Sequence, residues 1–111
     1  MYDKLPRGLY AIVDDSLRVD MPVVELAQGA VQGGARVIQL RLKRTTDRSA
    51  LLLIQEVIAQ CRPLGVMVLV NDRCDLAMLS DADGVHLGDE DVPVPVAGSL
   101  LGPSKIIGKT C

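Results

Sequence analysis

The chain has 111 residues, a formal net charge of −2 and 49% hydrophobic residues, yet its only aromatic side chains are Tyr2 and Tyr10. A chain of this length forms one domain or part of one, and its core must be aliphatic. The 12 basic residues are scattered and no aromatic series offers stacking platforms, so nucleic-acid binding is excluded.

Apolar segments of strand length alternate with longer segments of helical period. The predicted elements, in chain order, are strand 9–14, a helix from about Met21 (N-cap Asp20, Pro22 in its first turn) to Gly33-Gly34, strand 36–41, helix 47–64, strand 66–70, helix 72–79, strand 84–87, a short helix 94–101 and strand 105–108. This order is typical of βαβ units and predicts an α/β fold with about five parallel strands and four intervening helices. No linker or internal repeat divides the chain, so residues 1–111 are interpreted as one unit.

The second strand shows how side chains divide between the two faces of the sheet. Successive side chains alternate, which points Val37, Gln39, Arg41 and Lys43 one way, and Ile38, Leu40 and Leu42 the other way, onto the helices. The same parity groups Ile12 with Asp14, and Gly84 with His86 and Gly88. The polar set therefore predicts a ligand-binding face.

Each concentrated polar motif falls at the carboxyl end of a predicted strand. These motifs are Asp14-Asp15, Arg41 to Lys43, Asn71-Asp72, Gly88 to Asp91, and Thr110. Active sites of parallel α/β folds, open or closed, lie at that edge. The coincidence of several motifs indicates an enzyme's substrate-binding region.

Two carboxylates in this set suit a magnesium ion. Asp72 and Asp91 are hard oxygen donors, and Mg²⁺ takes one or two protein carboxylates together with water and substrate phosphate. If the carboxylates lie about 4 Å apart, their repulsion is of order 4 kcal/mol at an effective dielectric constant of about 20. A cation would remove that repulsion.

The remaining polar side chains suit a phosphorylated heterocycle. Arg41 grips phosphate in a bidentate manner, and Lys43 adds a point charge beside it. Asn71 and Gln39 carry both hydrogen-bond donors and acceptors, so they match the polar edge of a ring.

Several segments, in order and spacing across the whole chain, carry a family resemblance. They are Gly8 to Asp14, Val37 to Lys43, Asn71-Asp72-Arg73 with Asp75-Leu76-Ala77, Ala82 to Gly88, Glu90-Asp91 and Lys105 to Gly108. This pattern closely resembles the thiamine phosphate synthases.

The resemblance implies a TIM barrel and a place in thiamine biosynthesis. Enzymes of that family are transferases that join hydroxymethylpyrimidine diphosphate to thiazole phosphate, giving thiamine phosphate and diphosphate; Mg²⁺ stabilises the leaving diphosphate, and the thiazole nitrogen attacks the pyrimidine cation. Carried over by position, the substrate-binding residues are Gln39, Leu40, Arg41, Leu42, Lys43, Asn71 and Thr110, and the Mg²⁺ ligands are Asp72 and Asp91. No residue is singled out as catalytic.

Two positions and the length depart from the family pattern. Leu42 stands where the family often has an acidic residue, and the segment 108–111 around Thr110 differs from the usual one. A full (β/α)₈ barrel typically needs about 250 residues, whereas about five strands are predicted. We therefore expect a partial (β/α)₈ barrel, with residues 1–111 as the N-terminal portion of a single barrel domain. We therefore expect a partial magnesium and diphosphate site, no coupling by this chain alone, and self-association through open sheet edges.

The cysteines and the apolar runs bear on location. Cys61, Cys74 and Cys111 are odd in number and lack Cys-x-x-Cys spacing, which argues against a disulfide framework and a structural zinc site. Residues 1–8 contain no apolar stretch typical of a signal peptide, and no run approaches the roughly 20 residues needed to span a bilayer. We expect a cytoplasmic protein with small-molecule substrates and no membrane partner.

Individual residues also have structural interpretations that involve no ligand. Asp72 would be a helix N-cap, Asp91 a solvated loop carboxylate, and Arg41 and Lys43 a surface ion-pair set. His86 is interpreted as structural and is left out of catalysis. A P-loop at Gly108-Lys109-Thr110 is excluded because position 103, where a glycine is required, is proline.

Other functions are alternatives to the synthase. A response-regulator receiver would use Asp14-Asp15 and Asp72, but Lys105 is followed by Ile106 and not by the expected proline. A TenI-like thiazole tautomerase is a closer alternative, although such relatives tend not to keep the pyrimidine-site residues. A non-catalytic remnant or binding module is a third possibility.

Overall fold

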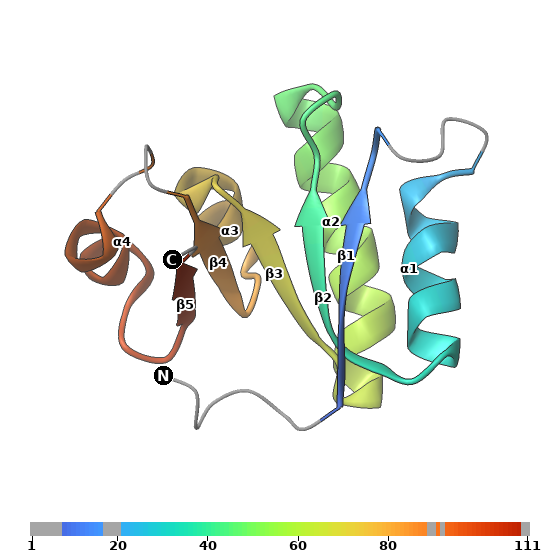
Figure 1. The fold of residues 1–111 in the computed structure, drawn as a ribbon. Helices are drawn as coiled ribbons and strands as arrows, with labels where there is room; N and C mark the ends of the chain where they lie inside the picture. Colours follow the sequence, from blue (N-terminus) through green and yellow to red (C-terminus); the bar gives the residue numbers. More distant parts are fainter. Residues whose placement is uncertain (1–7, 17–20, 89–90, 92, 110–111) are drawn as a thin grey trace.

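The computed structural model describes residues 8–16, 21–88, 91 and 93–109. Within these ranges one parallel sheet has the strand order β1-β2-β3-β4-β5 (Figure 1). The strands are β1 (Leu9–Asp14), β2 (Ala35–Arg41), β3 (Met67–Asn71), β4 (Gly84–Leu87) and β5 (Ile106–Lys109). The helices are α1 (Val23–Gln32), α2 (Asp47–Cys61), α3 (Cys74–Ser80) and α4 (Val94–Leu101). The predicted βα alternation is confirmed.

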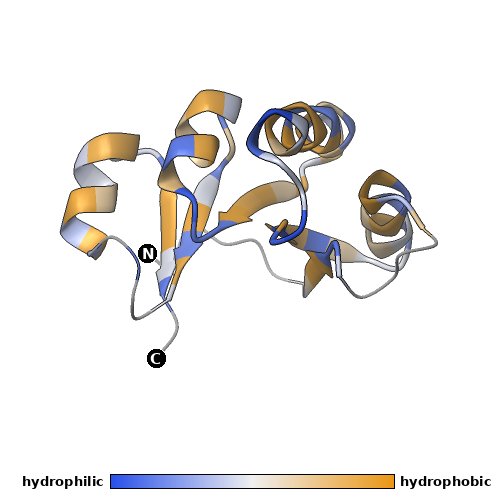
Figure 2. Cartoon of the chain, turned by 90° about the horizontal axis from the view of Figure 1, so that it is seen from above, coloured by the Kyte–Doolittle hydropathy of each residue, from blue (hydrophilic) through white to orange (hydrophobic). Residues whose placement is uncertain are grey.

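The helices lie along one side of the sheet, and the other side has no helical cover from the residues that the structure describes (Figures 1 and 2). This arrangement, with sequential strand order, is that of a barrel wall. A receiver domain is doubly wound, with helices on both faces and β1 inside the sheet. The receiver interpretation is therefore wrong.

The core between sheet and helices is aliphatic, as the composition requires. Its most deeply buried side chains include Ile38, Leu40, Ile54, Val57 and Val68, all inaccessible to solvent. Because β2 alternates, Ile38 and Leu40 join this core while Val37 lies in a second, smaller cluster with Leu69 and Ile106. The predicted division of β2 between two faces is confirmed.

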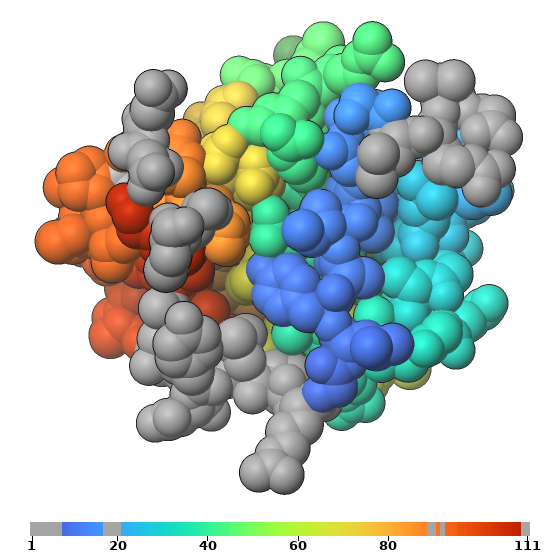
Figure 3. Space-filling model, viewed as in Figure 1, coloured from blue at the N-terminus to red at the C-terminus, as the bar shows by residue number. Residues whose placement is uncertain are grey.

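The helix-free face is partly exposed along β1. Tyr10 and Ile12 retain 43% and 55% of their accessible surface. The blue side chains of β1 accordingly reach the surface near the middle of the space-filling view (Figure 3). β1 pairs only with β2, and β5 only with β4, so each has an open edge within the described residues.

Most element boundaries agree with the sequence, and the differences have local causes. The second helix stops at Cys61 and continues as one 3-10 turn, Arg62–Leu64, because Pro63 lacks an amide donor; Gly65 then adopts a left-handed φ of 73°. The third and fifth strands lie one residue later than predicted. The first helix begins at Val23, and its predicted cap, Asp20, lies outside the described residues.

The third helix, α3, shows the main difference from the sequence-based prediction. It was predicted over 72–79 but covers Cys74–Ser80, since Asp72 has a φ of 67°, which no right-handed helix includes. Arg73 occupies the N-cap position. The helix-cap interpretation of Asp72 is therefore wrong.

No helix in the described part of the chain is long and apolar enough to cross a membrane.

Gly84 marks the closest approach between β4 and β5. A Cβ atom there would lie 1.9 Å from the Ile106 carbonyl oxygen, which is backbone and has no freedom to rotate away. Gly84→Ala should lower the free energy of unfolding by about 3 kcal/mol or more in urea titrations. The matched change Gly29→Ala, within α1, places its Cβ where nothing lies within 4 Å, and should raise stability by roughly 0.5–1 kcal/mol. Similar effects of the two changes would contradict the tight β4–β5 packing.

Candidate active site

Parallel register aligns the strand ends and brings their polar side chains to one edge. Asp14 lies opposite Arg41, and Asn71 lies opposite His86, which in turn lies opposite Gly108. A Cβ on Gly108 would come within 2.8 Å of His86 Nδ1, so glycine there makes room for the imidazole. Of the motifs predicted at this edge, Asp14, Arg41 and Asn71 lie at neighbouring strand ends within the described residues.

Arg41 and Asp14 form an ion pair at this edge. Arg41 Nη1 lies 2.8 Å from Asp14 Oδ2, and Asp14 is only 5% exposed. Asp14 Oδ1 accepts hydrogen bonds from the Ser16 hydroxyl (2.6 Å) and amide (2.8 Å). These two bonds, and then Arg41, outweigh the cost of burial and hold the pKa of Asp14 at about 2. Asp14 therefore keeps its charge and orients Arg41.

Lys43 and Asp72 form a second ion pair. The left-handed backbone of Asp72 is fixed by its amide, which donates to the His86 carbonyl oxygen at 2.7 Å. Burial acts to raise the pKa of Asp72, but hydrogen bonds with Lys43 and Asp91 and the charges of Lys43 and Arg41 lower it overall. Asp72 is thus an anion beside two cations. A strained backbone at such a residue is typical of functional sites.

Asp91 faces the same small volume as Asp72. Its Oδ2 accepts a hydrogen bond from the Gly88 amide at 2.6 Å. A Cβ on Gly88 would lie 3.2 Å from Asp91 Oδ2 and 4.0 Å from Asp72 Oδ1, so glycine keeps this volume open between the carboxylates.

The two carboxylates fit the way Mg²⁺ binds in proteins. Within the described residues no three Asp, Glu, His or Cys side chains gather closely enough for a metal site made of protein alone. Mg²⁺ commonly uses one or two carboxylates and takes its other ligands from water and phosphate. The donor set of Asp72 and Asp91 therefore fits Mg²⁺ that is bound together with a phosphorylated ligand.

A chain of hydrogen bonds crosses the helix-free face beside these charges. Asn71 Nδ2 donates to Gln39 Oε1 at 2.8 Å, and Gln39 Nε2 donates to the Tyr10 hydroxyl at 2.7 Å. Asn71 Oδ1 is buried without a hydrogen-bond partner among the described residues. Sequence reasoning missed Tyr10, although extending the parity of Ile12 and Asp14 by two residues would have placed it on this face.

Asp15 holds the loop after β2, a role that the sequence did not reveal. Its Oδ2 accepts hydrogen bonds from the Arg44 amide (2.8 Å) and the Thr45 hydroxyl (2.7 Å). This loop carries Lys43, so Asp15 restricts where the Lys43 side chain starts. In the sequence, Asp15 was noticeable only as the second residue of an acidic pair at the end of a strand.

The other predicted substrate-binding residues differ in their accessibility. Leu40 is fully buried in the core, and Leu42 packs against it, so only their backbone groups are available to a ligand on the helix-free face. Leu40 and Leu42 line a hollow of about 320 Å³ at the same end of the sheet, together with Ile54 of α2 and Leu76 of α3; Lys43, Asn71 and Arg73 also line it. Thr110 lies outside the described residues.

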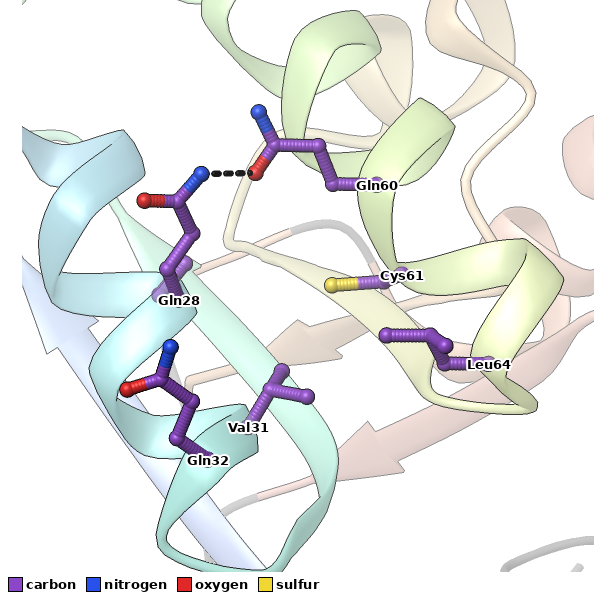
Figure 4. Close-up of a pocket in the computed structure, with 7 residues that line it drawn as sticks. Gln28, Val31, Gln32, Gln60, Cys61 and Leu64 are labelled. Carbon is purple, nitrogen blue, oxygen red and sulfur yellow. Dashed lines mark hydrogen bonds between the residues drawn. The ribbon is translucent and has the colours of Figure 1, made fainter.

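A larger hollow, of about 480 Å³, lies between α1 and α2 (Figure 4). Gln28 Nε2 donates to Gln60 Oε1 across it at 3.0 Å, and the Cys61 thiol points toward it. Burial raises the pKa of Cys61, with a further contribution from the charge of Asp83. The lining residues carry no charge, so this hollow does not suit phosphate or Mg²⁺.

Removing the Ser16 hydroxyl should change the pKa of Asp14 and the way stability depends on pH. Ser16→Ala removes one of the bonds to Asp14, so the pKa of Asp14 should rise above about 2 in carboxyl NMR titrations. Because a depressed carboxylate pKa stabilises the fold above the unfolded value, the variant should be less stable by about 1 kcal/mol at pH 7. The difference in stability between the parent chain and Ser16→Ala should shrink as pH falls from about 4 toward about 2, where Asp14 protonates in the parent chain.

Ser99→Ala is the control, because the Ser99 hydroxyl donates to the Pro95 carbonyl oxygen of its own helix. A constant stability difference for Ser16→Ala across that pH range would show that the hydroxyl does not act through Asp14.

Comparisons with known proteins agree with this geometry. A thiamine-phosphate synthase of Myxococcus xanthus (strain DK1622) is 54% identical over 106 residues, which are 96% of this chain and 49% of that protein. The thiamine biosynthetic bifunctional enzyme TH1, chloroplastic, of Arabidopsis thaliana is 45% identical over 93% of this chain and 20% of its own length. Among solved structures, a thiamine phosphate pyrophosphorylase from Pyrococcus furiosus matches with a TM-score of 0.83 and 39% identity, covering 96% of this chain and 50% of that one.

The chain thus spans about half the length of the Myxococcus synthase and of the Pyrococcus pyrophosphorylase, and a smaller share of the bifunctional enzyme. The model of the family described as thiamine monophosphate synthase, TMP-TENI, matches residues 9–111. The chain belongs to the thiamine monophosphate synthase family.

Proposed function

We propose that this chain carries the magnesium and pyrimidine diphosphate part of a thiamine phosphate synthase site. The reaction is the coupling of hydroxymethylpyrimidine diphosphate with thiazole phosphate, which releases diphosphate. The observation that carries the proposal is the convergence of Asp72 and Asp91 on Gly88, with Lys43 paired to Asp72. The names of the relatives support the same reaction class.

Each side chain at the edge has a role in this proposal. Asp72 and Asp91 hold Mg²⁺, which supplies charge neutralisation for the leaving diphosphate. Arg41 and Lys43 bind the diphosphate oxygens, and their present carboxylate partners keep them oriented toward the edge. Gln39 and Asn71 contact the pyrimidine ring, with backbone groups of Leu40 and Leu42 and the Thr110 hydroxyl as further contacts.

In the proposed reaction one bond breaks and another then forms. The bond from the pyrimidine methylene carbon to the diphosphate oxygen breaks, and its electron pair leaves with diphosphate. The thiazole nitrogen then forms a bond to the methylene carbon. Cations aimed at the leaving group favour the departure of diphosphate because negative charge grows there in the transition state.

We also propose a cytoplasmic location, since both substrates are small phosphorylated molecules.

A thiazole tautomerase remains the nearest alternative within the family. The synthase is favoured because Gln39 and Asn71 are hydrogen-bonded to each other beside the Asp72 carboxylate, which is an arrangement for a ring with an attached diphosphate. A tautomerase does not require a diphosphate-binding set.

Replacing Asp72 tests the metal site. Asp72→Asn keeps a residue type that tolerates the left-handed backbone and removes the charge, so Mg²⁺-dependent binding of diphosphate should weaken by about tenfold or more in calorimetry. Asp81→Asn is the matched control, because Asp81 also has a left-handed φ, 59°, but lies at the end of α3. An unchanged dependence on Mg²⁺ in the Asp72 variant would remove Asp72 from its proposed role.

We also propose that the chain self-associates through its open edges and helix-free face. β1 and β5 each have one unpaired edge among the described residues, and Ile12 lies exposed on β1. Sedimentation velocity should show species larger than a monomer whose share rises with concentration. Ile12→Lys should shift the distribution toward monomer, whereas Leu52→Lys, on the exposed side of α2, should not. A monomer at every concentration would count against this proposal.

A further inference from the structure

Two ion pairs of opposite polarity connect the loop after β2 with the turn after β3. In the first, which we call the inner pair, Lys43 of the loop contacts Asp72 of the turn. In the second, which we call the outer pair, Arg73 of the turn reaches Asp47, the first residue of α2, with 3.0 Å between Nη1 and Oδ1. The two segments are therefore joined twice.

Asp75 fixes the orientation of the Arg73 guanidinium. Arg73 Nε and Nη2 donate to the two carboxylate oxygens of Asp75 at 3.0 and 2.8 Å, which is a bidentate contact that arginine makes and lysine does not. Arg73 Nη1 is left to donate to Asp47. Because Asp75 belongs to α3, this guanidinium ties together the starts of two helices that pack against each other (Figure 1).

The backbone of Arg73 closes the turn that aims Asp72. The Arg73 amide donates to the Asn71 carbonyl oxygen at 2.8 Å, which makes a three-residue turn with Asp72 at its centre. The φ of 67° at Asp72 is a conformation that residues other than glycine adopt at an energetic cost. Such a turn persists only where its surroundings hold it, and Arg73 is anchored through all three guanidinium nitrogen atoms.

The exposure of the outer pair argues against a main role in stability. The side chains of Arg73, Asp47 and Asp75 are 43%, 74% and 56% exposed. Exposed ion pairs add little to the free energy of folding, because water already solvates their charges. Arg73 and Asp47 nevertheless line the same hollow as Lys43 and Asn71. The outer pair is therefore suited to fixing the relative position of two segments at the edge of the site.

We infer that Arg73 is a positioning residue, which with Asp47 holds the loop after β2 against the turn after β3 while a ligand takes over the inner pair. This inference rests on the proposed function, because it concerns the same site. In the proposed complex Asp72 turns to Mg²⁺ and Lys43 turns to the phosphate oxygens, so the inner pair no longer joins the two segments. The outer pair stays intact and keeps the spacing at which both side chains reach the ligand.

Attraction between charges alone predicts the opposite effect for one member of the outer pair. Asp47 is an anion at the edge where diphosphate is proposed to bind, so its removal should tighten binding if only Coulomb attraction mattered. If Asp47 is instead the anchor of Arg73, its removal should weaken binding although a repulsive charge has gone. The sign of the effect of Asp47→Ala therefore separates the two explanations.

The test measures the affinity for inorganic diphosphate with Mg²⁺ by calorimetry. Arg73→Gln and Asp47→Ala should each weaken binding about fivefold, because two segments that were held in place must become ordered on binding. The double variant should lose no more than about fivefold, since both changes remove the same tie. Arg73→Lys should not restore the affinity, because an ammonium group keeps the charge and loses the bidentate contact.

Two control variants match these changes. Arg62→Gln removes an arginine of similar exposure, 47%, which pairs with Asp81 at the end of α3, and it should leave diphosphate affinity unchanged. Glu25→Ala removes an acidic residue from the first turn of α1, as Asp47→Ala does in α2, and it should not weaken binding.

A second measurement needs no ligand. The Asp72 amide donates to the His86 carbonyl oxygen at 2.7 Å, so its hydrogen exchange reports how often the turn opens. In a Lys43→Met chain, which lacks the inner pair, adding Arg73→Gln should speed exchange of this amide several-fold. Adding Arg62→Gln to the same chain should not.

The outcomes separate this inference from the proposed function. If the parent chain binds no diphosphate with Mg²⁺, the proposed function fails, while exchange at Asp72 still judges the tie. If diphosphate binds and Asp47→Ala tightens binding or leaves it unchanged, the positioning role is overturned. Full recovery of affinity in Arg73→Lys would overturn it as well, because charge would then be sufficient. Equal exchange at Asp72 with and without Arg73 in the Lys43→Met chain would contradict the tie itself.

Discussion

The structure depends on the parallel pairing of its strands in sequential order. Pairing of this kind puts every strand's carboxyl end at the same edge, and the two-residue period then decides which side chains there face the helices. Arg41 and Leu42 are neighbours in sequence, yet Arg41 pairs with Asp14 while Leu42 packs against the core. One geometric rule thus separates the residues proposed to bind the ligand from the residues that pack in the core.

Opposite charges keep the edge ordered before any ligand binds. Arg41 is held by a carboxylate that two further hydrogen bonds from Ser16 keep ionised, and Lys43 is held by Asp72. Without these partners, flexible cationic side chains would lose conformational freedom when they bind phosphate, and affinity would fall. The ion pairs are therefore a form of preorganisation for the negatively charged ligand that we propose.

The second constraint on this edge of the sheet is that glycine residues let neighbouring segments pack closely. A Cβ on Gly84 would lie 1.9 Å from the Ile106 carbonyl oxygen, so backbone would have to move. A Cβ on Gly88 would lie 3.2 Å from Asp91 Oδ2, so the Asp91 carboxylate would have to shift slightly. Asp72 adds a left-handed backbone between β3 and α3, which turns its carboxylate toward Asp91. The left-handed conformation has an energetic cost that the surrounding packing and hydrogen bonds must balance.

The sequence by itself determined the order of elements, the aliphatic core and the face to which Gln39, Arg41 and Lys43 belong, because periodicity and composition are local properties. It also brought Asn71, Asp72 and Asp91 to strand ends, where a shared site is expected. Only the tertiary structure decided that Tyr10 joins Gln39 and Asn71, that Asp15 holds the loop after β2, and that Asp72 leaves the helix. Each of these depends on residues distant in sequence or on a backbone conformation that no pattern of residue types specifies.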